Sequence, residues 1–416
     1  MTPTVVIVAT LDTKGQEVGF LKELIEQKGC SAIVIDVGTL DPPAAIPDVT
    51  REAVAEKAGS SLDSLAAQRD RRVAVETMIR GASLVVMELH RHGKLSGVIS
   101  IGGGTGTHIG MGIMRTLPLG VPKLMVSTVA SRDMRELIGT KDIIVMHSVT
   151  DILGLNAVTK RILANAAAAI AGMAHDAAEV VRDKPVVGLT SFGFITHGAM
   201  LVKGFLEDLG YDVAPFHANG TGGMAMEDLI DQGLISGVLD LALHEFSDAM
   251  YGGYCGSIGP GRLESAGAQG IPQVLVPGGL DCIVLEFNSE ETKPADMKGR
   301  KVFWYDFRSG VRTNRDDVLA LAKTISEKLN RAKGPTKVVI PMRGWSEADI
   351  AGGPLDDPEV NAAFIDELKS RLRKDIPVVE VDAHICDAEF ARAVVSEFHE
   401  LMQASGSSPD ISRAPR

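Results

Sequence analysis

Short runs of aliphatic residues alternate along the first half of the chain with stretches in which apolar residues recur at helical spacing. Each aliphatic run ends in small or polar residues, as strands do where they meet a turn. The pattern predicts strands at 4–9, 31–37, 97–101, 122–127 and 142–146, and helices at 15–28, 64–91, 104–116 and 158–181. Strands and helices that alternate in this way are typical of a parallel sheet with helices on both faces.

The same pattern restarts after the sequence RDKP at 182–185, where a charged segment is followed by a proline. It predicts strands at 186–190, 211–216, 237–242, 273–276, 301–305, 336–341 and 377–381, and helices at 197–209, 223–232, 315–331, 358–373 and 387–404. We therefore predict two doubly wound, Rossmann-like α/β domains with mainly parallel sheets, at 1–183 and 184–405, and a disordered polar tail at 406–416. In such folds the ligand cleft lies at the carboxyl ends of the strands.

Composition narrows the class of protein. Only 4% of the residues are aromatic and 44 are glycine, so the core must be aliphatic, as in buried parallel strands joined by glycine-rich turns. A net charge of −12 with no basic patch argues against a nucleic-acid partner. The four cysteines form no CxxC pair, which argues against a disulfide framework. The chain shows neither a signal peptide nor the roughly 20 apolar residues of a membrane span, so we expect a cytoplasmic protein with no membrane partner.

The run ISIGGGTGT at 99–107 joins a predicted strand to a predicted helix. Its three consecutive glycines let the backbone approach a ligand closely, and Thr105 offers a hydroxyl group beside them. Backbone N–H groups at a helix N-terminus attract phosphate, so we predict a phosphate-binding turn. The run lacks the lysine of a P-loop and fails the dinucleotide-binding fingerprint at its last position. A glycine-rich turn that binds no ligand is the alternative.

Polar residues at the carboxyl ends of neighbouring strands converge on this glycine run. Lys14 would supply the positive charge that the run lacks, and Asp36 stands where an acidic residue often binds a ribose hydroxyl group. Because the carboxyl ends of parallel strands meet at one edge of the sheet, we predict a mononucleotide-type site there. Its predicted residues are Lys14, Asp36, Gly38, Thr39, Gly102, Gly103, Gly104, Thr105, Ser127, Thr128 and Ser148.

The predicted turns of the second half of the chain also contain side chains that could bind a ligand or take part in a reaction. Arg262 and Arg312 suit bidentate contact with a carboxylate or phosphate, and a structural ion pair is the alternative for each. Cys282 would need a nearby base to act as a nucleophile, and a buried thiol is the alternative. A metal site is conceivable as well, although histidines at strand ends are more often hydrogen-bonded turn residues. Its candidate ligands are His217, His244, Asp281 and His384.

Several of these turns together resemble one known family. The matching motifs are ATLDTKG, ISIGGGTGT, STVAS, HANGTGG, GPGRLESAGAQGIPQVLVPGGLDCIV, VRTNRDD and VDAHICDAEFA. They resemble the uncharacterised protein family UPF0261, also called the Tm-one-like ATP-binding domain family, over residues 3–405. The resemblance implies two α/β domains, an ATP site in the N-terminal domain and a homodimer. Some related proteins also carry a C-terminal TIM-barrel domain, so a separate barrel protein is a candidate partner.

The chain also departs from the family pattern in its second half. Asn219 stands where Thr is expected and Cys386 where Asn is expected, and the segment 282–307 is divergent. These departures bear on the second-domain site more than on the ATP site.

The resulting hypothesis is a protein that binds ATP, together with Mg²⁺, and uses it to phosphorylate or activate a small acidic metabolite held by the second domain. Positioning and charge neutralisation would carry such a reaction. Its predicted catalytic or substrate-contacting residues are Arg262, Asp281, Arg312 and His244. Two alternatives stay open: a non-enzymatic ATP-sensing module that regulates a partner, and a metal- or Cys-dependent hydrolase centred on His244, Asp281 and Cys282.

Overall fold

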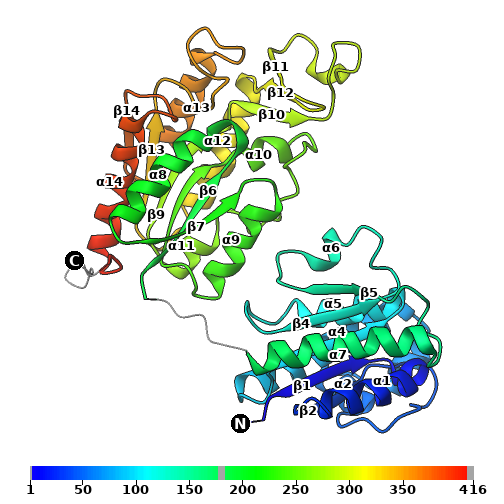
Figure 1. The fold of residues 1–416 in the computed structure, drawn as a ribbon. Helices are drawn as coiled ribbons and strands as arrows, with labels where there is room; N and C mark the ends of the chain where they lie inside the picture. Colours follow the sequence, from blue (N-terminus) through cyan, green and yellow to red (C-terminus); the bar gives the residue numbers. More distant parts are fainter. Residues whose placement is uncertain (1, 177–182, 410–416) are drawn as a thin grey trace. The chain divides into compact units, whose positions relative to one another are not determined.

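The computed structural model describes residues 2–176 and 183–409 of the chain. The chain divides into two compact units, Met1–Val181 and Arg182–Arg416, called unit 1 and unit 2 below (Figure 1). Residues 177–182, where the predicted helix 158–181 would end, and residues 410–416, most of the predicted tail, lie outside the described residues. Within the described ranges, every helix falls short of the length and apolar character that a bilayer span requires.

Unit 1 is built around five parallel strands in the order β2-β1-β3-β4-β5. The strands are β1 (Thr4–Ala9), β2 (Ser31–Asp36), β3 (Gly97–Gly102), β4 (Lys123–Ser127) and β5 (Ile144–His147). The helices are α1 (Leu11–Glu26), α2 (Arg51–Lys57), α3 (Leu62–Gln68), α4 (Arg71–Arg91), α5 (Gly104–Met114), α6 (Arg135–Ile138) and α7 (Ala157–His175). The strand order reverses direction between β1 and β3. Such a switch point is where doubly wound folds form a ligand crevice.

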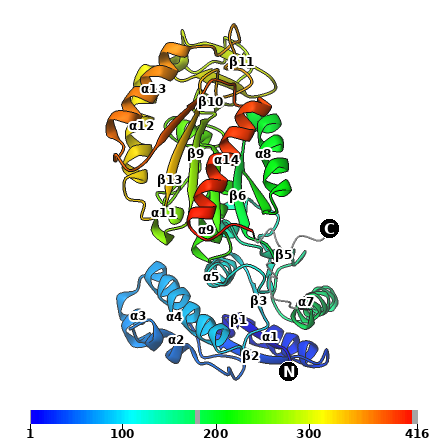
Figure 2. The same cartoon turned by 90° about the vertical axis from the view of Figure 1, so that its left-hand side faces the viewer.

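Alternate residues of the strands pack on opposite faces of this sheet, as the two-residue period of a strand requires. In β1, Val5 and Ile7 belong to the core formed with α1 and α7, whereas Val6 and Val8 belong to the core formed with α2, α4 and α5. Figure 1 and Figure 2 show these two layers of helices on either side of the sheet. Burying each of these side chains contributes about 1.5–3 kcal/mol, which fixes the register of the strands.

The predicted helix 64–91 is wrong as a single helix. Residues 62–91 form two helices, α3 and α4, with a break at Arg69, whose φ is 51°. The Asp70 carboxylate accepts hydrogen bonds from the N–H groups of Arg72 and Val73, so it caps the N-terminus of α4. The break therefore sets the position of Arg71, the first residue of α4. Two short helices, α2 and α6, were not predicted at all.

Unit 2 contains six parallel strands in the order β14-β13-β9-β8-β6-β7. They are β6 (Val186–Ser191), β7 (Asp212–His217), β8 (Gly237–Ala242), β9 (Gln273–Gly278), β13 (Thr336–Pro341) and β14 (Val378–Val381). The helices are α8 (Thr196–Asp208), α9 (Thr221–Asp231), α10 (His244–Ala249), α11 (Ser265–Gln269), α12 (Arg315–Leu329), α13 (Pro358–Arg371) and α14 (Ala388–Ala404), with 3-10 turns η1 (Gly193–Ile195) and η2 (Ala295–Met297). The order again reverses between β6 and β8.

The helices of unit 2 also cover both faces of its sheet. Val274 and Val276 of β9 pack in the core that includes α8 and α14, whereas Leu275 between them packs with α12 and α13. Figure 2 shows α12 and α13 on one side of this sheet and α8 and α14 on the other. The prediction of two doubly wound α/β folds with mainly parallel sheets is confirmed.

A small antiparallel sheet interrupts the second half of unit 2. It has the order β10-β12-β11, made of β10 (Cys282–Leu285), β11 (Val302–Trp304) and β12 (Ser309–Arg312). The predicted strand 301–305 is therefore real but does not belong to the main sheet. The strands β10 and β12 were not predicted, because runs of four residues give little periodic signal. Two of its strands, β10 and β11, lie in the segment 282–307 that departs from the family pattern.

Candidate functional site

The loops that follow β1, β2 and β3 enclose a pocket of about 280 Å³, called the switch-point pocket below. It lies at the carboxyl ends of β1 and β3, where the strand order of unit 1 reverses. Five of the residues predicted from the sequence line it: Lys14, Thr39, Gly103, Gly104 and Thr105. The topology has therefore brought together three loops that are far apart in the sequence.

The glycine run forms the wall of this pocket. Strand β3 ends at Gly102, and α5 begins at Gly104 after an N-cap, Gly103, that has no capping side chain. The first N–H groups of a helix have no partner within the helix, so this end of α5 is open to an anion. Gly102 has a packing role instead, because a Cβ atom there would lie 2.7 Å from the Cα atom of Gly106.

Two cationic side chains from different elements reach the pocket. Lys14 lies at a kink in α1, with φ −126° and ψ 15°, and its Nζ donates to the carbonyl of Ile152 at 2.5 Å. Arg71 at the start of α4 also lines the pocket, and its Nη2 donates to Thr105 Oγ1 at 3.1 Å. Sequence reasoning missed Arg71. The signal was Asp70, a good N-cap residue, directly before it.

Asp36 does not line the pocket. Its side chain is fully buried, and Oδ1 accepts hydrogen bonds from the N–H groups of Leu11 and Gly38 at 3.0 and 2.9 Å. Burial raises the pKa of this carboxyl group. Asp36 thus fixes the starts of α1 and of the turn after β2, and this placement does not support the predicted ribose contact.

Asp12 is the carboxylate that lines the pocket. Its Oδ2 accepts a hydrogen bond from the Leu40 N–H at 3.0 Å, whereas its Oδ1 has no hydrogen-bond partner. A Cβ atom at Gly38 would lie 2.8 Å from the Asp12 carboxylate, so glycine at position 38 is needed for this approach. Gly38 therefore serves the site indirectly, through Asp12.

The three predicted hydroxyl residues stand at the end of β4 or directly after β4 and β5. Ser127 is buried and its Oγ lies 2.7 Å from Thr107 Oγ1, while Ser148 Oγ donates to the carbonyl of Thr150 at 2.6 Å. Thr128 is half-buried, and its N–H donates to the carbonyl of Gly102. These contacts hold the turns beside the glycine run, and none of the three residues lines the pocket.

A second pocket of about 240 Å³ adjoins the first and shares Thr39, Leu40 and Arg71 with it. The rest of its lining is mostly aliphatic and comes from α3 and the start of α4: Leu62, Leu65, Ala66, Arg69, Asp70 and Ala74. One continuous region thus offers a polar, cationic part and an apolar part.

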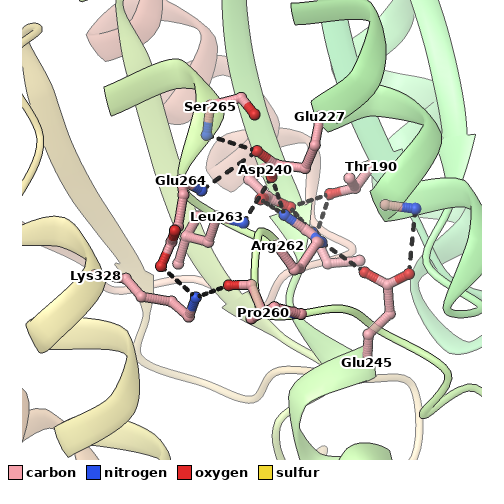
Figure 3. A network of polar contacts seen from close by, with 12 residues as sticks. Thr190, Glu227, Asp240, Glu245, Pro260, Arg262, Leu263, Glu264, Ser265 and Lys328 are labelled. Atoms are coloured by element: carbon pink, nitrogen blue, oxygen red, sulfur yellow. Dashed lines mark hydrogen bonds and ion pairs between the residues drawn. The ribbon is translucent and has the colours of Figure 1, made fainter. Parts of the chain in front are cut away.

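In unit 2, Arg262 is fully buried among three carboxylates (Figure 3). It binds Asp240 through two hydrogen bonds of 2.6 and 2.8 Å, Glu245 at 2.7 Å and Glu227 at 3.3 Å. Burial by itself disfavours the charged guanidinium, but the carboxylates outweigh it and raise the pKa of Arg262 well above its ordinary value. Arg262 therefore forms a structural ion pair, which was the alternative in the sequence analysis. Its burial does not support the predicted contact with a substrate.

The carboxylates around Arg262 also organise the backbone. Glu227 accepts hydrogen bonds from three consecutive N–H groups, those of residues 263–265. Glu245 accepts from the N–H groups of Gly220 and Gly223. A Cβ atom at Gly223 would lie 2.2 Å from Glu245 Oε2, so the Gly-Thr-Gly-Gly turn at 220–223 makes room for this ion-pair network.

Asp281 and Arg312 lie together near the carboxyl end of β9. Arg312 Nη1 donates to the backbone carbonyl of Asp281 at 2.8 Å, and Asp281 Oδ2 accepts from Ser346 Oγ at 2.6 Å. Asp281 Oδ1 and Arg312 Nε are buried without a hydrogen-bond partner. A second buried carboxyl group, Asp349, accepts from Asn361, whose side-chain oxygen also accepts from Arg312 Nη2. The sequence analysis did not single out Asp349.

The predicted metal ligands are not brought together. His217 Nδ1 lies 3.3 Å from the carbonyl of Ser191, and His384 Nε2 lies 2.9 Å from that of Ser346, as expected for hydrogen-bonded turn residues.

His244 is buried and stacks on Phe192 with ring centroids 3.8 Å apart. Among the described residues, the group with metal-binding spacing is His244 with Asp248 and Cys255.

Cys282 is a poor nucleophile in this arrangement. Its Sγ lies 3.8 Å from His244 Nδ1, the ring nitrogen that also lies 3.0 Å from the carbonyl of Gly279. Burial raises the pKa of the thiol to about 12, which keeps it protonated at neutral pH. The structure therefore favours the alternative of the sequence analysis, in which Cys282 is a buried thiol and not a nucleophile.

The family is decided by two matches that together span nearly the whole chain. Residues 3–179 match the N-terminal domain, and residues 184–402 the C-terminal domain, of the Uncharacterised protein family (UPF0261). The chain belongs to this family. A UPF0261 protein of Clostridium tetani is 41% identical over 97% of this chain and 100% of its own length. The ToMV resistance protein Tm-1(GCR237) of Solanum lycopersicum is 34% identical over 97% of this chain, which spans 56% of that protein.

A solved structure, that of the UDP-N-acetylglucosamine 2-epimerase from Rickettsia bellii, is similar to this chain at 9% identity. The match covers 97% of this chain and 99% of that one, with a TM-score of 0.24. A similarity of this size carries no inference about function.

Proposed function

We propose that unit 1 binds ATP in the switch-point pocket, with the phosphates at the N-terminus of α5. The observation that carries the proposal is the open end of this helix between two cations, Lys14 and Arg71, from different elements. Helix N-terminal N–H groups and cationic side chains both favour phosphate, and together they would offset the charge of a triphosphate.

The adjoining apolar pocket suits the adenine base. Ligand pockets are mostly apolar with a few polar groups that fix orientation, and the lining from Leu62, Leu65, Ala66 and Ala74 has this character. Thr39 lines both pockets, which supports it as a contact for the ribose that would connect base and phosphates. A Mg²⁺ ion also fits the residues present, because Asp12 Oδ1 is free to hold it beside the phosphates.

The proposal extends to the use of the nucleotide. In unit 2, Arg312 and Asp281 are buried like Arg262. They differ from Arg262, whose three guanidinium nitrogens are all hydrogen-bonded, because Arg312 Nε and Asp281 Oδ1 lack partners. A small carboxylic acid would satisfy Arg312 Nε with its carboxylate and Asp281 Oδ1 with a hydroxyl group. We propose phosphorylation or activation of such an acid. Formation of ADP (phosphorylation) or of pyrophosphate (adenylylation) that depends on an added carboxylic acid supports this reaction, whereas tight ATP binding without either product supports the ATP-sensing alternative. The homodimer and the separate barrel partner stay predictions.

Replacing Lys14 or Arg71 by alanine should weaken ATP binding about 10- to 100-fold each. A hydrogen bond to a charged group contributes about 1.5–3 kcal/mol, and each factor of ten in affinity corresponds to about 1.4 kcal/mol. Isothermal titration calorimetry of the full chain with ATP, with and without Mg²⁺, measures the effect. The matched controls Lys22→Ala on α1 and Arg91→Ala on α4 remove the same charges from the same helices, away from the pocket.

Two results would contradict the ATP site. A folded wild-type protein that does not bind ATP would leave the glycine run as a turn without a ligand. Equal affinity in the pocket variants and in the controls would place the nucleotide elsewhere. Weaker binding of AMP than of ATP is expected as well, since the cations and the helix end contact the outer phosphates.

A further inference from the structure

We propose that unit 2 holds a divalent metal ion of the zinc type, bound by His244 Nε2, the Asp248 carboxylate and the Cys255 thiolate. This inference does not depend on the ATP site, which lies in unit 1. The three side chains are buried, and their ligand atoms lie within 4.8 Å of one another.

The local sequence explains how these three residues meet. His244 and Asp248 are four residues apart on α10, so they share one face of the helix. The glycine-rich loop after α10 then folds back over Asp248, and the N–H of Cys255 donates to Asp248 Oδ2 at 2.8 Å. A Cβ atom at Gly253 would lie 2.6 Å from Asp248 Cγ, and one at Gly256 2.7 Å from the nitrogen of Ala249. These glycines allow the loop to bring Cys255 to the helix.

The spacing suits a tetrahedral ion. His244 Nε2 and Asp248 Oδ2 are 3.3 Å apart. Two ligand atoms about 2.0–2.1 Å from a tetrahedral zinc ion lie about 3.3 Å from each other, and a thiolate sulfur lies somewhat farther away. The imidazole and the carboxylate therefore need little movement to bind the same ion.

His244 Nε2 is the second and independent sign of a ligand. It is fully buried and makes no hydrogen bond among the described residues, although buried polar atoms are rarely left unpaired. Its near neighbour is the Asp248 carboxylate at 3.3 Å, which forms an ion pair with the ring only if Nε2 is protonated. The other ring nitrogen, Nδ1, lies 3.0 Å from the carbonyl of Gly279. A carbonyl oxygen only accepts, so Nδ1 carries a proton, and Nε2 is the ring nitrogen that faces Asp248 and Cys255. A histidine that binds a metal is commonly oriented in this way.

The charges and the types of donor favour zinc over magnesium or calcium. One carboxylate and one thiolate neutralise a divalent ion, so the buried site would carry no net charge. Sulfur and imidazole ligands select zinc-like ions, whereas magnesium and calcium prefer oxygen. The other carboxylate oxygen of Asp248, Oδ1, accepts a hydrogen bond from the N–H of Val284 at 2.6 Å. This bond fixes the orientation of the carboxylate. Three protein ligands leave one position for water or an anionic oxygen.

Cobalt(II) is the probe for this site, because its spectrum reports both geometry and thiolate ligation. Full-length protein treated with a chelator and then titrated with Co²⁺ should bind one ion per chain and develop a thiolate-to-cobalt charge-transfer band. Cys255→Ser should abolish the band and weaken binding at least tenfold. The matched control Cys282→Ser removes the thiol on the Nδ1 side of the same ring and should keep the band.

A metal-uptake measurement on the wild-type protein is enough to overturn the inference, and the two variants test which residues bind the metal. Folded wild type that takes up neither Co²⁺ nor Zn²⁺ would show that His244 and Asp248 form a simple ion pair. A thiolate band that persists in Cys255→Ser, or disappears in Cys282→Ser, would assign the metal to other residues. ATP titration of the metal-free protein separates the two proposals, since loss of the metal should leave ATP binding in unit 1 unchanged.

Discussion

Replacing Arg262 by methionine should destabilise unit 2 by about 3–5 kcal/mol, the usual cost of removing one partner from a buried ion pair. Methionine fills a similar volume, so the loss measures charge rather than packing. The substitution leaves Asp240, Glu245 and Glu227 buried without their cation, and all three are at most 4% exposed. The cost should be high here because one guanidinium serves three carboxylates.

Tryptophan fluorescence during urea unfolding measures this effect in unit 2 alone. The chain has two tryptophans, Trp304 and Trp345, and both belong to unit 2. The control Arg343→Met breaks an exposed ion pair with Asp382 and should cost about 0–1 kcal/mol. A loss below about 1 kcal/mol in Arg262→Met would contradict the structural role and restore Arg262 as a candidate substrate contact.

The hydrophobic pattern predicted the sheets because long, buried parallel strands give a strong and regular signal. β1 and β3 were found within one residue of their observed ends, and their residues are almost completely buried. The pattern failed where tertiary contacts decide the structure. The break at Arg69 depends on one left-handed residue and one capping carboxylate, and both fit a helical pattern in the sequence.

The switch-point pocket was predictable in part for the same reason. Topology brings the carboxyl ends of β1, β2 and β3 together, so Lys14, Thr39 and the glycine run could be grouped from the sequence. Arg71 comes from a helix that follows none of these strands directly, and only the folded chain places it there. Asp36 was predicted to contact the ribose because the sequence shows its position at the end of a strand. The sequence does not show that its side chain is buried.

In unit 2 the same limit led to the wrong grouping of residues. His244 and Asp281 were noted because they stand near strand ends, and a metal set was drawn from histidines at such positions. The residues that do meet His244 are Asp248, one helical turn away, and Cys255, carried by a glycine-rich loop. A spacing of four residues is readable from sequence, but the return of a glycine-rich loop to the helix is not.

Replacing Asp349 by asparagine should stabilise unit 2 at pH 8 by about 2–4 kcal/mol and have little effect near pH 4. Burial, together with the charge of Asp281, raises the pKa of Asp349 from 3.8 to about 7. A carboxyl group whose pKa is higher in the folded state binds its proton more tightly there. Its contribution to stability is therefore present below about pH 4 and is lost as the pH rises through about 7.

Asparagine suits this test because the hydrogen bonds of Asp349 survive the change. The N–H of Trp345 and the side-chain amide of Asn361 both donate to the same oxygen, Oδ2, at 3.0 and 2.8 Å. An amide oxygen can accept both, while the charge that is costly to bury is gone. The difference in unfolding free energy between variant and wild type should therefore grow between pH 4 and pH 7 and then level off.

Urea unfolding at a series of pH values, followed by tryptophan fluorescence, measures this difference. Asp366→Asn, the same change on the exposed face of α13, should give a difference that does not vary in this way with pH. If Asp349→Asn is instead less stable than the wild type at pH 8, the ionised carboxylate is being stabilised by a partner. Arg312 is the nearest candidate, because Asn361 binds both it and Asp349. That result would make the buried group around Asp281 an anionic site rather than a protonated one.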